Sequence, residues 1–160
     1  MVRLSEKALT YLNLGIQSEI KAYVFYKKIL SMLDDKELIE LVEKLAMDEK
    51  HHFLQLEDEY DKNVRSEMWA PYKDIMRKEG LPDIDEYISE THEEMLSQLS
   101  SIKTKRELLE LALILEKEAY EFFNDCYEKV DEPEIQTIFD NLRNFEKGHV
   151  LTVENAIKNL

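Results

Sequence analysis

Residues 142–150 read LRNFEKGHV and place Glu146 and His149 three positions apart. On an α-helix this spacing puts both side chains on one face. The same face carries Ile138 and Leu142, so a carboxylate and an imidazole interrupt an apolar stripe. An amphipathic helix normally fills such a stripe with aliphatic side chains that form the core. The two polar residues therefore need an explanation, and they direct attention to other residues in the same kind of setting.

A second copy of this pattern lies 97 residues earlier, at Glu49 and His52. In each half of the chain another glutamate, Glu19 or Glu116, stands 30 residues before the Glu-x-x-His pair. The segments EIKAYVFY and EKEAYEFF, which begin at these two glutamates, share Glu, Ala, Tyr and Phe at the same places. The constant offset indicates an internal duplication of a helical hairpin.

The apolar periodicity predicts four long helices. Two run over 5–33 and 34–62, and the others begin at Thr104 and within 131–133. The start signals are Ser5 as an N-cap, Asp34 followed by Glu37, Thr104 with Glu107 as a capping box, and Pro133 in a first turn. Only three Gly and three Pro interrupt the chain, which favours long helices over a many-stranded sheet.

The segment 63–103 separates the two hairpins and contains a helical pattern over 83–99. A helix of about 25 residues spans about 38 Å, and this connection is long enough to run back along the bundle. We therefore expect an all-α, ferritin-like four-helix bundle: two helical hairpins, 5–62 and 104–160, joined by a long, partly helical crossover. The length predicts a single domain over 1–160.

Composition excludes several classes of function. The net charge of −14 argues against nucleic acid and anionic membrane surfaces as partners. The hydrophobic fraction of 44% argues against a disordered chain. A single cysteine, Cys126, excludes an internal disulfide and a four-cysteine metal site. The start of the chain has no signal-peptide pattern and there is no membrane-spanning run, so we expect a cytoplasmic protein.

Four glutamates on core stripes pose an electrostatic problem. Burying an ionised carboxylate without a partner costs several kcal/mol or more, and no Lys or Arg shares these stripes. Two divalent cations would balance the four charges, and two neutral imidazoles would complete the shell. The alternative, that each Glu/His pair is a surface contact, leaves the carboxylates without partners. The predicted ligands are Glu19, Glu49, His52, Glu116, Glu146 and His149. Mixed oxygen and nitrogen ligands suit two iron ions, or manganese, with zinc as a substitute in purified samples.

At these motifs the chain resembles the rubrerythrin-like branch of the ferritin-like superfamily. The resemblance implies that Glu49 and Glu146 bridge two metals, while Glu19 and Glu116 are terminal ligands; all four would act in catalysis through the metals. Two departures stand out. Relatives often carry a rubredoxin domain with paired Cys-x-x-Cys motifs, and they place a further glutamate where this chain has Ala119.

Other side chains near the ligands have two interpretations. Tyr26 either hydrogen-bonds a ligand carboxylate or supplies an electron, or it is a core aromatic, which Phe123 at the equivalent position favours. Ala22 and Ala119, one turn past the terminal ligands, either leave room for dioxygen or peroxide or permit close helix packing. Asp48, one turn before His52, is placed to orient the free ring nitrogen of that histidine.

The predicted function is that of a rubrerythrin-like, non-haem di-iron oxidoreductase which reduces hydrogen peroxide or dioxygen in oxidative-stress defence. The electrons would come from an external, rubredoxin-like donor, and the expected assembly is a homodimer. Three alternatives remain open: a ferroxidase or iron-handling protein, a di-manganese catalase, and a metal-stabilised bundle without turnover. The sequence does not decide whether the hairpins pair within one chain or swap between two.

Overall fold

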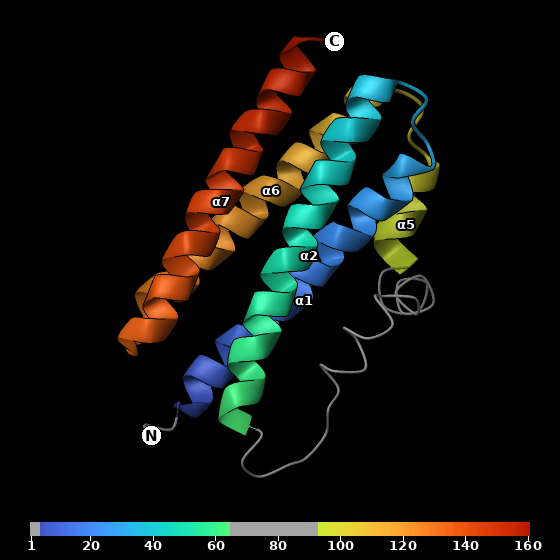
Figure 1. The fold of residues 1–160 in the computed structure, drawn as a ribbon. Coiled ribbons are helices and arrows are strands. Elements are labelled where there is room, and N and C mark those ends of the chain that lie inside the picture. The colour runs from blue at the N-terminus through green and yellow to red at the C-terminus, as the bar shows by residue number, and fades with distance from the viewer. Residues whose placement is uncertain (1–3, 65–92) are drawn as a thin grey trace.

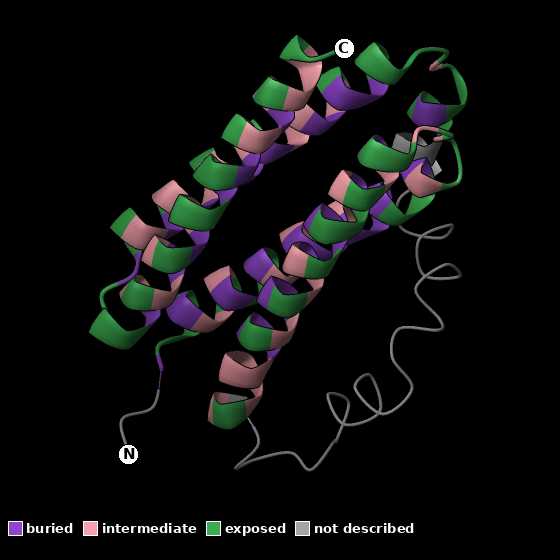
Figure 2. Ribbon diagram, turned by 45° about the horizontal axis from the view of Figure 1, so that its top comes forward, coloured by how far each residue is buried: buried purple, intermediate pink, exposed green. Residues whose placement is uncertain are grey.

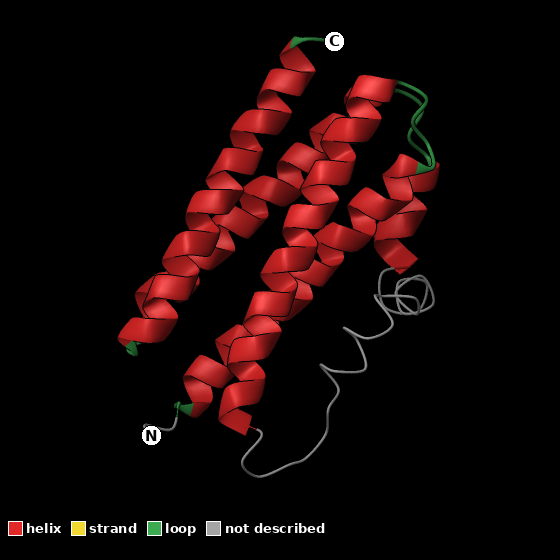
Figure 3. Cartoon of the chain, in the orientation of Figure 1, coloured by secondary structure: helices red, strands yellow, loops and turns green. Residues whose placement is uncertain are grey.

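The computed structural model of the protein describes residues 4–64 and 93–160. These residues form α-helices joined by short loops, and the described part of the chain contains no strand (Figure 3). The helices are α1 (Glu6–Leu30), α2 (Lys36–Val64), α5 (Glu93–Ser100), α6 (Lys105–Lys129) and α7 (Pro133–Lys158). The all-α prediction is confirmed. None of the described helices is long and apolar enough to cross a membrane.

Local signals explain where the helices begin. The Ser5 hydroxyl accepts a hydrogen bond from the backbone N–H three residues on, at 3.1 Å, and Thr104 does the same at the start of α6. Pro133 occupies the first turn of α7. The expected start of α2 at Asp34 is two residues early, because the helix begins at Lys36. Asp35 caps it: its Oδ1 accepts hydrogen bonds from the backbone N–H groups of Glu37 and Leu38, at 3.0 and 3.2 Å.

The four long helices form two antiparallel hairpins that pack into one bundle (Figure 1). In the first hairpin α1 lies along α2, and in the second α6 lies along α7. Contacts between α1 and α6 and between α2 and α7 join the hairpins, so the ferritin-like four-helix bundle is confirmed. In this structure each hairpin pairs within the chain. Of the expected crossover, α5 packs against α1, whereas residues 65–92 lie outside the described part.

The bundle interior is divided into two apolar clusters, and the buried faces of the helices point toward it (Figure 2). One cluster gathers Val24, Phe25 and Val42, and the other gathers Leu12 and Phe139, with further side chains around each. In α1, α6 and α7 the predicted ligand glutamate stands where the helix passes from one cluster to the other, and in α2 the change follows Phe53, four residues after Glu49. The buried glutamates and histidines therefore form a polar layer across the middle of the core: Glu19, Glu49, His52, Glu116, Glu146 and His149.

Candidate metal centre

All six predicted ligands lie inside the bundle, and none is more than 5% exposed. One glutamate comes from α1 and one from α6, whereas α2 and α7 each contribute a Glu-x-x-His pair. They are Glu19, Glu116, Glu49 with His52, and Glu146 with His149. The alternative that these pairs are surface contacts on a solvated face is therefore wrong.

The structure brings these six residues together in two overlapping groups. The first consists of Glu19, Glu49, His52 and Glu146, and the second of Glu49, Glu116, Glu146 and His149. Within each group the potential ligand atoms all lie within 4.8 Å of one another. Glu49 and Glu146 belong to both groups, which are the positions that the resemblance assigns to bridging ligands. The arrangement offers two candidate ion positions that have two carboxylates in common.

Both histidines direct Nδ1 at the carboxylates. The Nδ1 of His52 lies 3.3 Å from an oxygen of Glu19 and 3.7 Å from one of Glu146. The Nδ1 of His149 lies closer to its neighbours, 2.9 Å from Glu49 and 3.3 Å from Glu146. In both cases the ring nitrogen and the carboxylate oxygens converge on a common point, as ligands of one ion do.

The buried polar atoms of this layer are left without hydrogen-bond partners. They include both carboxylate oxygens of Glu19, Glu49 and Glu146, one oxygen of Glu116, and the Nδ1 atoms of His52 and His149. Native proteins pair nearly all buried polar groups, so such a concentration of unpaired atoms is typical of a site that holds ions or protons. Divalent cations satisfy carboxylate oxygens and imidazole nitrogens together, and the residues present therefore fit a two-metal centre.

The protonation equilibria of the layer reflect the crowding of acids. Burial raises the pKa of Glu19 well above its ordinary value, and the charges of Glu146 and Glu49 raise it further. Burial and the neighbouring Glu146 raise the pKa of Glu116 in the same way. Burial lowers the pKa of His52, but the nearby carboxylates outweigh it and raise the pKa to about 9. Without cations, the layer holds protons in their place.

Tyr26 is part of this layer as well as of the apolar core. Its side chain is buried, and its hydroxyl donates a hydrogen bond to Oε1 of Glu116 on α6. Burial, followed by the charge of Glu116, raises the pKa of Tyr26 well above its ordinary value, so the phenol keeps its proton. The hydrogen bond leaves Oε2 of Glu116 facing the ring of His149, at 3.4 Å from Nδ1. A catalytic role for Tyr26 stays a prediction.

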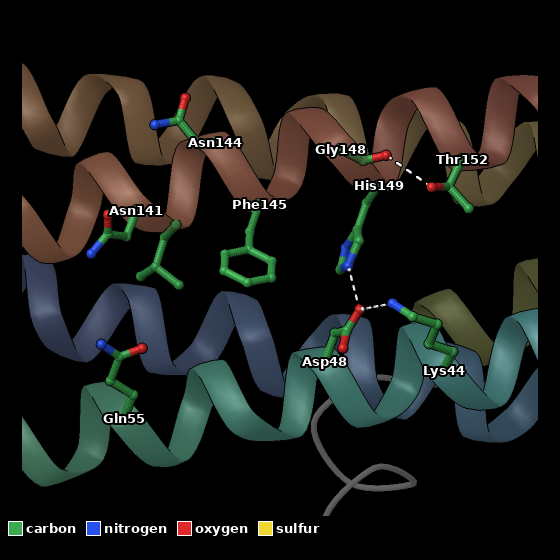
Figure 4. Close-up of a pocket in the computed structure, with 10 residues that line it drawn as sticks. Lys44, Asp48, Gln55, Asn141, Asn144, Phe145, Gly148, His149 and Thr152 are labelled. Atoms are coloured by element: carbon green, nitrogen blue, oxygen red, sulfur yellow. Dashed lines mark hydrogen bonds and ion pairs between the residues drawn. The ribbon is translucent and has the colours of Figure 1, made fainter.

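The prediction that Asp48 orients His52 is wrong. The Oδ2 atom of Asp48 instead lies 3.1 Å from Nε2 of His149 on α7 (Figure 4). Lys44, one turn earlier on α2, donates to the same oxygen at 3.1 Å. Burial raises the pKa of Asp48, but the hydrogen bonds with Lys44 and His149 outweigh it, and the pKa lies below its ordinary value. The carboxylate stays ionised and reaches across to the neighbouring helix.

This contact was missed because it depends on how two helices face each other. α2 and α7 run antiparallel, so the residue before the glutamate of one helix lies beside the histidine of the other (Figure 1). The edge of the Phe145 ring on α7 accordingly packs against His52, with the ring centroids 4.6 Å apart. Both contacts could have been predicted from the internal duplication by packing the two Glu-x-x-His helices against each other in antiparallel orientation.

Two openings lie beside the layer. Asp48, Phe145 and His149 line an open groove of about 640 Å³ between α2 and α7 (Figure 4). A cavity of about 360 Å³ between α1 and α6 includes Ala22 and Ala119 in its lining. Ala22 and Ala119, for which space beside the terminal ligands was one of two interpretations, therefore border a cavity.

Comparison with known proteins agrees with this geometry. The family model described as Rubrerythrin matches residues 10–157. A search of curated proteins returned no match. A solved structure of a hypothetical protein from Pyrococcus furiosus superposes with a TM-score of 0.67 at 20% sequence identity, covering 94% of this chain and 88% of that one. At this identity the likeness speaks for the shared fold.

Proposed function

The chain belongs to the rubrerythrin family, and on that premise we propose that it is a di-iron oxidoreductase that reduces hydrogen peroxide or dioxygen. The observation that carries the proposal is the pair of overlapping ligand groups built from six buried side chains. Two ferrous ions held there would supply the two electrons that, with two protons, convert peroxide into two water molecules.

The residues of this chain would prepare the centre for that chemistry. Four carboxylates would balance the charge of two dications, and two imidazoles would complete the ligand sets. The apolar clusters on both sides keep bulk water out of the layer. Tyr26 keeps its proton and holds one oxygen of Glu116 by a hydrogen bond. The cavity bordered by Ala22 and Ala119 has room for a small oxidant beside the terminal ligands.

We propose a separate electron donor. These 160 residues contain one cysteine, Cys126, which cannot form a four-cysteine iron centre. Cys126 is buried, and burial raises the pKa of its thiol to about 12, so it is a poor redox group. A small protein of the rubredoxin type has the one-electron chemistry that such a donor needs.

A single-turnover experiment tests the proposal. The protein is loaded with two ferrous ions, mixed with one equivalent of peroxide or with dioxygen, and followed by absorption as the iron is oxidised. We expect oxidation much faster than that of free ferrous iron. Glu116→Ala should abolish the acceleration, whereas Glu121→Ala, which changes an exposed glutamate five residues along the same helix and outside the cavity lining, should not. A rate equal to that of free iron would reject the proposal.

A second candidate is an iron-handling role as a ferroxidase. The observation in its favour is Ala119, which is buried next to the centre at the position where the resemblance expects an additional carboxylate. With six ligands, the set resembles ferroxidase centres more than peroxidase centres. Repeated addition of ferrous iron under air distinguishes the two functions. A ferroxidase oxidises many equivalents per chain without a donor, whereas the proposed oxidoreductase stops after two.

A further inference from the structure

The two ion positions share the same kinds of ligands but have different surroundings. We infer that the position built on Glu116 and His149 binds its ion more tightly, and fills first, than the position built on Glu19 and His52. This rests on the two-metal centre proposed above. The reason is that Tyr26 and Asp48 of the first hairpin form hydrogen bonds with Glu116 and His149. Among the described residues, the second hairpin forms no equivalent hydrogen bonds with Glu19 and His52.

The first support is the bond between Asp48 and His149. With its Oδ2 3.1 Å from Nε2, the ionised carboxylate accepts a hydrogen bond from the N–H of that nitrogen. This keeps the lone pair on Nδ1, which faces Glu49 and Glu146. A carboxylate behind a metal-binding histidine selects the tautomer, orients the ring and makes the ligand more basic. Lys44 bonds the same carboxylate oxygen and so holds it in position.

The equivalent support is missing at His52. The residue 97 positions after Asp48 is Phe145, and its ring packs edge-on against His52. A phenyl ring offers no carboxylate to the imidazole. Among the described residues, Nε2 of His52 has no hydrogen-bond partner. Neither the tautomer nor the basicity of this histidine is set in the way that Asp48 sets those of His149.

The same asymmetry appears at the terminal glutamates. Tyr26 donates to Oε1 of Glu116, which leaves Oε2 in place near His149. The residue 97 positions after Tyr26 is Phe123, which has no hydroxyl to donate. Both oxygens of Glu19 are without hydrogen-bond partners. The carboxylate of Glu116 is thus oriented by a residue outside the ligand set, whereas the neighbour 3.3 Å from Glu19 is His52, which is itself a proposed ligand.

Both differences act in the same direction. Loss of a partner behind a metal ligand typically weakens metal binding by about 10- to 100-fold. Two such partners on one position and none on the other therefore predict at least about a tenfold difference between the two dissociation constants. The duplication supplied equal ligands, and the residues behind them made the two positions unequal.

Titration of metal-free protein with Co²⁺, followed by absorption, tests the inference. We expect two resolved binding steps. Asp48→Ala should weaken the tighter step by about tenfold or more and leave the other unchanged, and Asp48→Asn, which keeps an acceptor oxygen, should restore part of the loss. The control is Asp125→Ala: Asp125 also pairs with a lysine one turn away, Lys129 at 2.8 Å, although that lysine follows it in the chain, and no contact of Asp125 with a histidine is found among the described residues.

A gain-of-function variant makes the test independent of damage to the protein. Phe145 is 53% exposed, so Phe145→Asp places a carboxylate beside His52 at little cost to packing. We expect it to tighten the weaker step. Crystals grown with one equivalent of Co²⁺ should show anomalous scattering between Glu116 and His149.

Several results would overturn the inference while leaving the two-metal centre intact. These are two equal binding steps, equal weakening of both steps by Asp48→Ala, or a first ion seated between Glu19 and His52. Failure of the parent protein to bind any Co²⁺ would instead overturn the proposed function itself. The two failures are therefore distinguishable in the same titration.

Discussion

The two hairpins provide the same ligands at the same spacing, yet they differ in the residues that contact those ligands from behind. Tyr26 and Asp48 of the first hairpin hydrogen-bond with Glu116 and His149, whereas the second hairpin has Phe123 and Phe145 at the equivalent positions, and Phe145 packs against His52. The ligands are constrained by the charge that the centre must balance. The neighbouring residues at positions 26, 48, 123 and 145 do not have to balance that charge, so an aromatic side chain without a hydrogen bond can occupy such a position. The comparison shows that a duplicated site can keep its composition while its halves acquire different properties.

The largest expected effects come from removing, one at a time, the glutamates that both hairpins contribute to the proposed centre. Glu146→Ala takes a ligand from both groups, and we expect the protein to lose both ions. Glu19→Ala takes a ligand from one group, and we expect one ion to remain. Metal analysis after dialysis against trace cobalt distinguishes them. Equal metal content in the two variants would mean that the shared carboxylates do not bridge the positions.

Metal removal and a change of pH should alter the stability that the buried Glu and His side chains contribute, and leave unchanged the stability that the apolar clusters contribute. In the metal-free protein the pKa of His52 is raised to about 9, so its stabilising contribution is complete below pH 6.5 and is lost as pH rises through 9. The raised pKa values of Glu19 and Glu116 act in the same direction. Metal binding needs deprotonated ligands and therefore strengthens with pH.

We thus expect the melting temperature of the metal-free protein to fall between pH 6.5 and 9, and that of the cobalt-loaded protein not to fall. At a cobalt concentration of about 100 times the dissociation constant, one bound ion adds about 2.7 kcal/mol to the free energy of unfolding. Calorimetry with and without a chelator provides the measurement. A parallel fall in both forms would contradict the assignment of the layer to metal binding.

Tyr26→Phe makes the first hairpin resemble the second at this position. It removes the donor to Glu116 and keeps the ring, so we expect a loss of about 1–2 kcal/mol in stability of the metal-free protein. Tyr127→Phe is the control, since Tyr127 is eleven residues further along α6, roughly 16 Å from Glu116 at 1.5 Å per residue. Denaturant unfolding of both variants measures the difference. Equal stability would show that the hydrogen bond contributes nothing.

The smallest expected effect concerns the residue just before each ligand histidine. The second hairpin has Gly148 there and the first has His51, and both are exposed in helices. A Cβ added to Gly148 would meet no atom within 4 Å. Gly148→Ala should therefore stabilise the protein by about 0.8–1 kcal/mol, because glycine is a poor helix former. His51→Ala should change stability by less than about 0.5 kcal/mol. Chemical denaturation of the two variants provides the comparison.

Much of the architecture was predictable from residue pattern alone. Apolar periodicity and capping residues located the four long helices, and the offset of 97 residues identified the hairpins. The predicted start of α2 was two residues early, since Asp34 and Asp35 are both acceptable near a helix start and only the folded helix selects Asp35 as its cap. Burial of the six polar residues followed from their places on apolar stripes.

The sequence by itself determined which side chains enter the core and how much negative charge they bring, because periodicity and charge can be read along each helix. Only the tertiary structure decided which group stands behind which ligand. The spacing of one turn predicted that Asp48 would contact His52, but because α2 and α7 pack antiparallel, Asp48 contacts His149 instead. Contacts across a helix interface depend on the direction and register of the partner helix, and no spacing along one helix contains that information.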